Sequence, residues 1–196
     1  MARQPAFIGV ALLVLAAVVT VGVVQASHRN DRTSLGPPPT PAQVHAALAG
    51  SPAPLASLHA QAGQLLGGGE SALRARLASL RGYPVVINKW ASWCQPCRSE
   101  FDVFQRVSAA LGRRVAFIGI DSNDYGNPRA FLAAHPVSYP SYVDRSGDAG
   151  NDLTLSSFFP VTVFYDRAGQ ESIIHQGPFL SVAELEAYIQ RYAPAS

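Results

Sequence analysis

The chain contains only two cysteines, Cys94 and Cys97, and just two residues separate them. Two thiols at this spacing can close a small disulfide, and a thiolate can attack a disulfide elsewhere. An apolar β-branched run ends at Trp90, and an amphipathic helical pattern begins at Cys94. A helix that starts there points free N–H groups and its positive dipole end at the first sulfur, and thiol pKa values in such sites fall to about 3.5–7.5 from about 8.5. The spacing therefore favours a redox dithiol in which Cys94 ionises readily and Cys97, one turn further, is shielded.

Three other uses of the thiols stay open at this stage. Half of a zinc site would need two more ligands, but no histidine has ligand spacing. A purely structural disulfide at this spacing closes too small a loop to stabilise much. The pair could also be two buried, inert thiols. The histidines are scattered over separate segments: His28, His45, His59, His135 and His175. We predict no metal and no cofactor.

Composition narrows the class of protein. The 196 residues are 48% hydrophobic and 14% charged, with a formal net charge of +2, and they contain no long run of basic residues, so a nucleic-acid partner is not expected. Two cysteines are too few for a disulfide-stapled scaffold, and the fold must rest on its core.

The N-terminus carries a long uncharged segment, residues 6–24. About 20 apolar residues are needed to cross a bilayer as a helix, whereas a signal peptide has an apolar region of about 7–15 residues. Residues 1–26 are therefore predicted to be a transmembrane anchor or a signal peptide, and the length favours the anchor, although Val24-Gln25-Ala26 resembles a cleavage site. Both interpretations place the rest of the chain outside the cytoplasm, either on a single-pass anchor in the cell membrane or secreted.

The pattern after this segment predicts one α/β domain. Residues 27–54 are polar and Pro-rich and are interpreted as an extended tether. Helices are expected over 55–66, 70–81, 94–111, 127–134 and 181–192, and strands over 84–90, 114–121, 161–166 and 171–176. This order implies parallel strand pairing first and an antiparallel hairpin later, in a mixed sheet with helices on both faces.

The segment "VVINKWASWCQPCRSEF" resembles the active-site segment of the thioredoxin superfamily, and in particular its extracytoplasmic TlpA/ResA-like branch. The similarity continues in "VAFIGIDSND", "VSYPSYVD", "FFPVTVFYDRAGQ" and "HQGPF", and it covers about residues 83–192. The resemblance implies a thioredoxin fold with a central mixed sheet flanked by helices. It divides the domain 55–196 into a helical addition, 55–82, and a core, 83–192.

The resemblance also implies roles for residues around the thiols. Cys94 matches the exposed nucleophile and Cys97 the resolving thiol of a Cys94–Cys97 redox disulfide. Glu100 matches an acidic residue that helps to move protons; a solvated helix carboxylate is the simpler interpretation. Trp93 forms the lip beside the nucleophile, and it can pack there as well.

The resemblance further implies a substrate groove at Phe159 and Pro160. Pro160 matches a proline that is cis in this superfamily, although the sequence alone indicates an ordinary proline at a strand start. The backbone of Phe159, which is bulky for this position, would pair with the substrate. Lys89 departs from the family, which usually has an aromatic residue there, and we expect its amino group to reach the surface rather than to join a proton path. Asn88 stands where cytoplasmic thioredoxins keep a buried aspartate.

These features together predict an extracytoplasmic thiol–disulfide oxidoreductase that exchanges electrons with protein thiols and disulfides. By resemblance the expected direction is reduction, for example in cytochrome c maturation, with electrons from an unidentified membrane donor. Two alternatives stay open, namely an oxidase that forms disulfides and a peptide-binding module that uses Trp93 and Pro160 without turnover.

Overall fold

The computed structural model of the protein describes residues 35–195. The predicted membrane-spanning segment, residues 6–24, lies outside the described residues. Between residues 35 and 195, no helix has both the length and the apolar character needed to cross a bilayer. From Pro38 onward the chain forms one compact unit.

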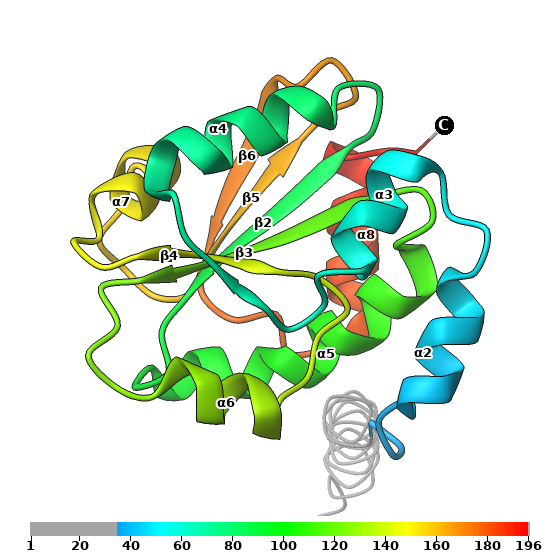
Figure 1. The fold of residues 1–196 in the computed structure, drawn as a ribbon, viewed down its shortest axis with the longest axis horizontal. Coiled ribbons are helices and arrows are strands. Elements are labelled where there is room, and N and C mark those ends of the chain that lie inside the picture. Colours follow the sequence, from blue (N-terminus) through cyan, green and yellow to red (C-terminus); the bar gives the residue numbers. More distant parts are fainter. Residues whose placement is uncertain (1–34, 196) are drawn as a thin grey trace, which may run out of the picture. The chain divides into compact units, whose positions relative to one another are not determined.

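The centre of this unit is a six-stranded mixed sheet with the strand order β1-β4-β3-β2-β5-β6 (Figure 1). The strands are β1 (Leu65–Leu66), β2 (Val85–Trp90), β3 (Ala116–Ser122), β4 (Ser141–Asp144), β5 (Val161–Tyr165) and β6 (Glu171–Gln176). The pairs β1–β4, β4–β3 and β3–β2 are parallel, whereas β5 pairs antiparallel with both β2 and β6. The predicted mixed sheet, parallel first and antiparallel later, is confirmed.

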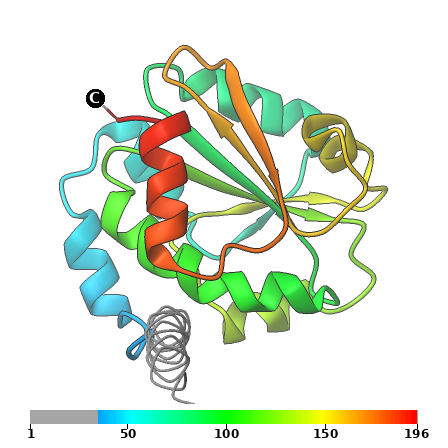
Figure 2. The same cartoon turned by 180° about the vertical axis from the view of Figure 1, so that it is seen from behind.

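Helices cover both faces of the sheet (Figures 1 and 2). In the described part of the chain they are α2 (Pro41–Leu48), α3 (Ala53–His59), α4 (Gly69–Ser79), α5 (Gln95–Leu111), α6 (Pro128–Ala134), α7 (Asp148–Thr154) and α8 (Val182–Tyr192). Apolar residues of α5, α6 and α8 form one core layer against the sheet, and those of α3 and α4 form the other. All six residues of β2 are buried, because this central strand has helices on both sides.

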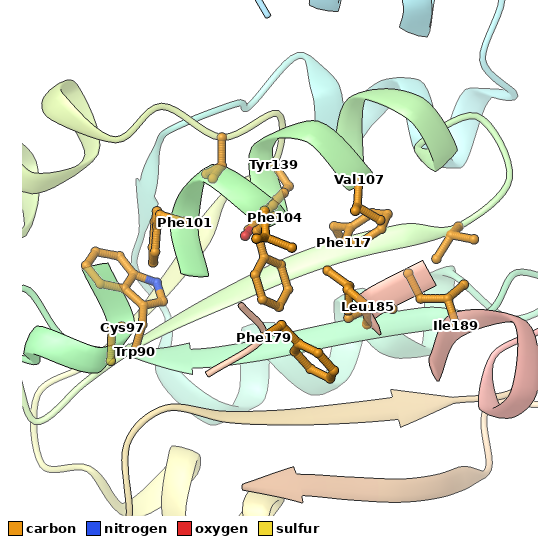
Figure 3. Packing of buried hydrophobic residues seen from close by; sticks show 14 of the residues in the cluster. Trp90, Cys97, Phe101, Phe104, Val107, Phe117, Tyr139, Phe179, Leu185 and Ile189 are labelled. Carbon is orange, nitrogen blue, oxygen red and sulfur yellow. The ribbon is translucent and has the colours of Figure 1, made fainter. Parts of the chain in front are cut away.

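The core on the α5 side extends away from the cysteines. Phe101, Phe104 and Val107 recur at helical spacing along α5 and pack toward Leu185 and Ile189 of α8 (Figure 3). Figure 3 places Cys97 and Trp90 at one end of this row and Ile189 at the other. The first turn of α5, which carries the thiol motif, is therefore held by a continuous apolar layer.

Several elements differ from the sequence predictions. The predicted tether is not extended throughout, because Pro41–Leu48 form α2, with Thr40 and Gln43 making a reciprocal capping box. The predicted helix over 55–66 ends at His59, and Leu65–Leu66 form the edge strand β1 beside β4. The segment interpreted as a helical addition thus also contributes a strand to the central sheet. Sequence analysis missed β4 and α7.

Candidate active site

Cys94 and Cys97 form a disulfide at the N-terminus of α5. Cys94 is the N-cap residue, and its Sγ accepts a hydrogen bond from the backbone N–H of Cys97 at 3.1 Å. Pro96 lies in the first turn, where its missing N–H costs no helical hydrogen bond. The predicted geometry is confirmed: the first sulfur receives an N–H at the positive end of the helix dipole.

The two sulfurs differ less in exposure than expected. Cys94 is 3% exposed and Cys97 is fully buried, so the prediction of an openly exposed Cys94 is wrong. Both cysteines belong to the apolar cluster on the α5 side, and Phe159 packs against this cluster. Only a small part of Cys94 is therefore open to solvent in the disulfide form.

A loop after β3 fixes the segment just before the cysteines. Asp124 accepts hydrogen bonds from the Ser92 backbone N–H at 2.5 Å and from the Ser92 hydroxyl at 2.8 Å, and also from the Gly126 N–H. The indole N–H of Trp93 donates to the carbonyl of Asn123 at 3.1 Å. Sequence analysis missed this role of Asp124, because the contact joins residues 32 positions apart.

Asp124 also has a carboxyl neighbour, Asp121 at the end of β3. Burial, followed by the hydrogen bond and the negative charge of Asp124, raises the pKa of Asp121 to about 8. Burial opposes ionisation of Asp124 too, but hydrogen bonds from Ser92 and Gly126 hold the pKa of Asp124 below its usual value. Of the two carboxyls, Asp121 therefore keeps its proton to higher pH than Asp124.

The predicted groove residues lie together beside the thiol motif. The peptide bond between Phe159 and Pro160 is cis, which confirms the prediction for Pro160. The Trp93 ring contacts the edge of the Phe159 ring, with centroids 5.2 Å apart, and stacks on Tyr125 at 5.1 Å. Trp93 remains 37% exposed, and it forms part of an aromatic rim next to Cys94.

Glu100 lies one turn beyond Cys97 on α5 and is fully buried. Its Oε1 accepts a hydrogen bond from Asn88 Nδ2 at 2.7 Å, and its Oε2 accepts one from the Phe179 N–H at 3.2 Å. The same Asn88 amide lies 3.4 Å from Thr162 Oγ1, on β5. The alternative of a solvated helix carboxylate is therefore wrong.

Burial raises the pKa of Glu100 to about 8, and the hydrogen bonds from Asn88 and Phe179 only partly offset this effect. Burial also raises the pKa of Tyr139, and the charge of Glu100 adds to the rise. Glu100 is thus a carboxyl that can hold or release a proton near neutral pH, one turn beyond Cys97 on α5.

The structure corrects the expectation for Lys89. Its side chain does not reach the surface but is fully buried. The amino group donates hydrogen bonds to Asn151 Oδ1 at 3.1 Å and to the carbonyl of Ser156.

Comparisons with known proteins agree with this geometry. The family model described as Redoxin matches residues 48–189. The thiol-disulfide oxidoreductase ResA of Oceanobacillus iheyensis is 29% identical over 122 residues, which cover 61% of this chain and 62% of the relative. A thiol:disulfide interchange protein DsbE homolog of Paracoccus denitrificans is 31% identical over 111 residues, covering 56% of this chain and 57% of the relative. The chain thus spans about three fifths of the length of these curated relatives.

Solved structures share the fold. A DsbF homologue from Corynebacterium diphtheriae superposes with a TM-score of 0.53 at 28% identity, over 59% of this chain and 75% of that one. A secreted Mycobacterium tuberculosis disulfide oxidoreductase, homologous to E. coli DsbE, gives 0.51 at 26% identity, over 58% of this chain and 85% of that one. The predicted thioredoxin-like fold is confirmed.

Proposed function

Since the chain belongs to the Redoxin family and has a thioredoxin-like fold, we propose that it is a thiol–disulfide oxidoreductase acting on polypeptide thiols and disulfides. The observation that carries this proposal is the Cys94–Cys97 disulfide at the N-terminus of α5, with a buried carboxyl, Glu100, one turn behind it. Relatives of the ResA and DsbE type are named for thiol–disulfide exchange, which supports the same chemistry here.

The exchange proceeds in two displacement steps. In the reduced protein the Cys94 thiolate attacks one sulfur of a substrate disulfide, forms a mixed disulfide and expels the other sulfur as a thiolate. Cys97 then loses its proton and attacks Cys94 Sγ, which releases the second substrate thiolate and closes the Cys94–Cys97 disulfide. The substrate gains two electrons, and the two released thiolates take up protons.

The substrate would bind at the aromatic rim. Trp93 and Phe159 flank the approach to Cys94, and the cis bond to Pro160 leaves the backbone of Phe159 as the partner for an extended substrate chain. Because Cys94 is only 3% exposed, a flexible segment can reach it more easily than a rigid surface can.

Glu100 serves as the acid–base group for Cys97. Burial raises the pKa of Glu100 to about 8, so this carboxyl can take up or return a proton near neutral pH. When it is ionised, the carboxylate also disfavours a thiolate nearby.

We further propose that the domain works outside the cytoplasm, held at the membrane by residues 6–24, and receives electrons from a membrane donor. Apocytochrome c thiols are the example of a reductase target that the ResA/TlpA resemblance suggests. An oxidase role is the alternative direction of the same chemistry.

A trapping experiment with the full chain in mild detergent tests the proposal. In Cys97→Ser the mixed disulfide cannot be resolved, because a serine hydroxyl does not attack a disulfide at neutral pH, so Cys94 should retain its substrate covalently. Adducts that disappear on adding dithiothreitol and that are absent from the Cys94→Ser, Cys97→Ser control are expected. Haem-attachment cysteines among the trapped peptides would indicate cytochrome maturation. If no adduct forms while Cys94 still alkylates readily, the protein is a binding module without turnover.

A further inference from the structure

Lys89 lies in an unusual place for a lysine. It occupies the last but one position of the central strand β2, paired with Ile120 of β3 on one side and Val161 of β5 on the other, and it is fully buried. Among the described residues no carboxylate lies within ion-pair distance of its amino group. Burial of an amine costs free energy, which must be offset by specific contacts at the amino group.

The charge of Asp144, at the end of β4, favours the ammonium form, and the hydrogen bonds of the amino group lead to α7 and the loop after it. The amino group donates to Asn151 Oδ1 in α7 and to the carbonyl of Ser156 in the following loop. The hydroxyl of Thr154 also lies 3.0 Å from that carbonyl, and the Ser156 N–H donates to the carbonyl of Asn151 at 3.2 Å. Lys89 therefore joins the central strand to a loop that is otherwise held mainly by its own short-range hydrogen bonds.

The aliphatic part of Lys89 is also fitted closely to α7. A Cβ atom on Gly150 would lie 2.9 Å from Lys89 Cδ and 2.6 Å from Ser122 Oγ, so a side chain at this position has no space. Gly150 thus lets α7 pack directly on the lysine stem. Beyond this contact the amino group reaches Asn151, Ser156 and Phe159.

The same amino group touches a residue of the groove. It lies 4.7 Å from the centroid of the Phe159 ring, a cation–π contact, and the edge contact to Trp93 is made by that same ring. Phe159 immediately precedes the cis bond to Pro160. The ring that borders the approach to Cys94 is therefore in contact with both Trp93 and the lysine.

We propose that Lys89 is a positioning residue for the substrate groove: it anchors the loop 155–160 and fixes the Phe159 ring against Trp93, so that the backbone beside Pro160 is ready to pair with a polypeptide substrate. The second half of this inference, the effect on substrate binding, rests on the proposed function. Its first half, the anchoring of the loop, is independent of any activity.

The test uses Lys89→Met in the full chain, which keeps the stem against Gly150 and removes the charge and both hydrogen bonds. Hydrogen exchange of the segment 153–160 is measured in the oxidised protein, and the KM and kcat for reduction of a cysteine-bridged model peptide are measured with dithiothreitol as donor. We expect exchange about 10-fold faster at Ser156 and Phe158, a KM raised about 10-fold, and kcat within about 2-fold of the wild type. In a Phe159→Leu background the same change should raise KM less, because the ring contact is already gone.

Ile87→Val is the matched control, since Ile87 lies on the same face of β2 two residues earlier and only loses a buried methyl group. It should leave exchange of the loop and KM unchanged. Unchanged exchange in Lys89→Met would overturn the anchoring, and faster exchange with an unchanged KM would overturn the role in binding. A wild type that reduces no peptide would instead count against the proposed function, while the exchange result still decides the anchoring.

Discussion

The buried carboxyl of Glu100 makes a quantitative prediction about stability and pH. A carboxyl that has a pKa of about 8 in the folded protein and an ordinary value of 4.5 when unfolded keeps its proton in the folded state over a range where the unfolded chain has lost it. Stability from this group is therefore complete below pH 4.5 and is lost as the pH rises toward 8. The shift corresponds to about 5 kcal/mol at about 1.4 kcal/mol per pKa unit.

Glu100→Gln removes this dependence. Below pH 5 we expect the variant to be about 1 kcal/mol less stable than the wild type, because Asn88 Nδ2 and the Phe179 N–H both donate to the carboxyl and a glutamine amide offers only one oxygen. Near pH 9 the order should reverse, with the variant more stable by several kcal/mol, since no buried charge has to form.

The assay is urea unfolding of the disulfide-intact protein at intervals from pH 4.5 to 9, and the quantity of interest is the difference in unfolding free energy between variant and wild type. Taking the difference cancels the contributions of Asp121 and Lys89, whose pKa values are also shifted by burial. Glu171→Gln, at an exposed position on β6, controls for the loss of one negative charge. Stability curves of Glu100→Gln and wild type that run parallel over this range would refute the assignment of a protonated, buried Glu100.

Two further predictions concern the surroundings of the thiols. In the reduced protein, iodoacetamide should modify Cys94 before Cys97 and below pH 8, since only Cys94 caps the helix and has an exposed edge. Mass spectrometry of the labelled peptides measures which cysteine reacts first. Preferential labelling of Cys97 would reverse the two roles. Asp124→Ala should lower the unfolding free energy by about 1–3 kcal/mol, because the Ser92 and Gly126 N–H groups lose their acceptor. Asp152→Ala, at an exposed position of α7, is the control. An equal loss of unfolding free energy in both variants would show that the Asp124 hydrogen bonds do not stabilise the fold.

The elements that carry the thiols could be predicted because their patterns are strong and local. β2 is a short β-branched run, and α5 repeats apolar residues every three or four positions from Cys97 to Val107. The same spacing contained a signal for Glu100, which stands three residues after Cys97 and four before Phe104, on the buried face of α5. Its burial was therefore readable from the helical period, although a charged residue there suggests the surface at first sight.

Other elements depend on contacts distant in sequence. β1 is two residues long, and it forms because the edge of β4 offers a partner: the Ser141 N–H donates to the carbonyl of Gln64, and Leu65 pairs with Ser141. The helix α7 is polar and contains a glycine, so its intrinsic helix propensity is low. Two contacts hold it in place: the Gly150 N–H donates a hydrogen bond to Asp144 Oδ2, and Gly150 packs on the Lys89 side chain. A single sequence does not show such pairings.

Lys89 illustrates a different limit. In a central strand covered on both faces, every residue is buried, so the alternation of polar and apolar residues that marks a half-exposed strand is absent. A lysine in such a run is ambiguous, because its long side chain often reaches solvent. Here the stem is closed in by Gly150, and the amino group ends on Ser156 and Phe159 instead.

The alternation of β2 connects the two halves of the proposed mechanism. Successive side chains of a strand point to opposite faces. Asn88 therefore faces α5 and meets Glu100 behind the thiols, while Lys89 faces α7 and meets the loop that leads to Pro160. A shift of β2 by one residue would exchange the two faces and break both sets of contacts at once. Two adjacent polar residues in a buried strand, each matched to a partner on its own side, thus link the register of β2 both to the carboxyl behind Cys97 and to the loop before Pro160.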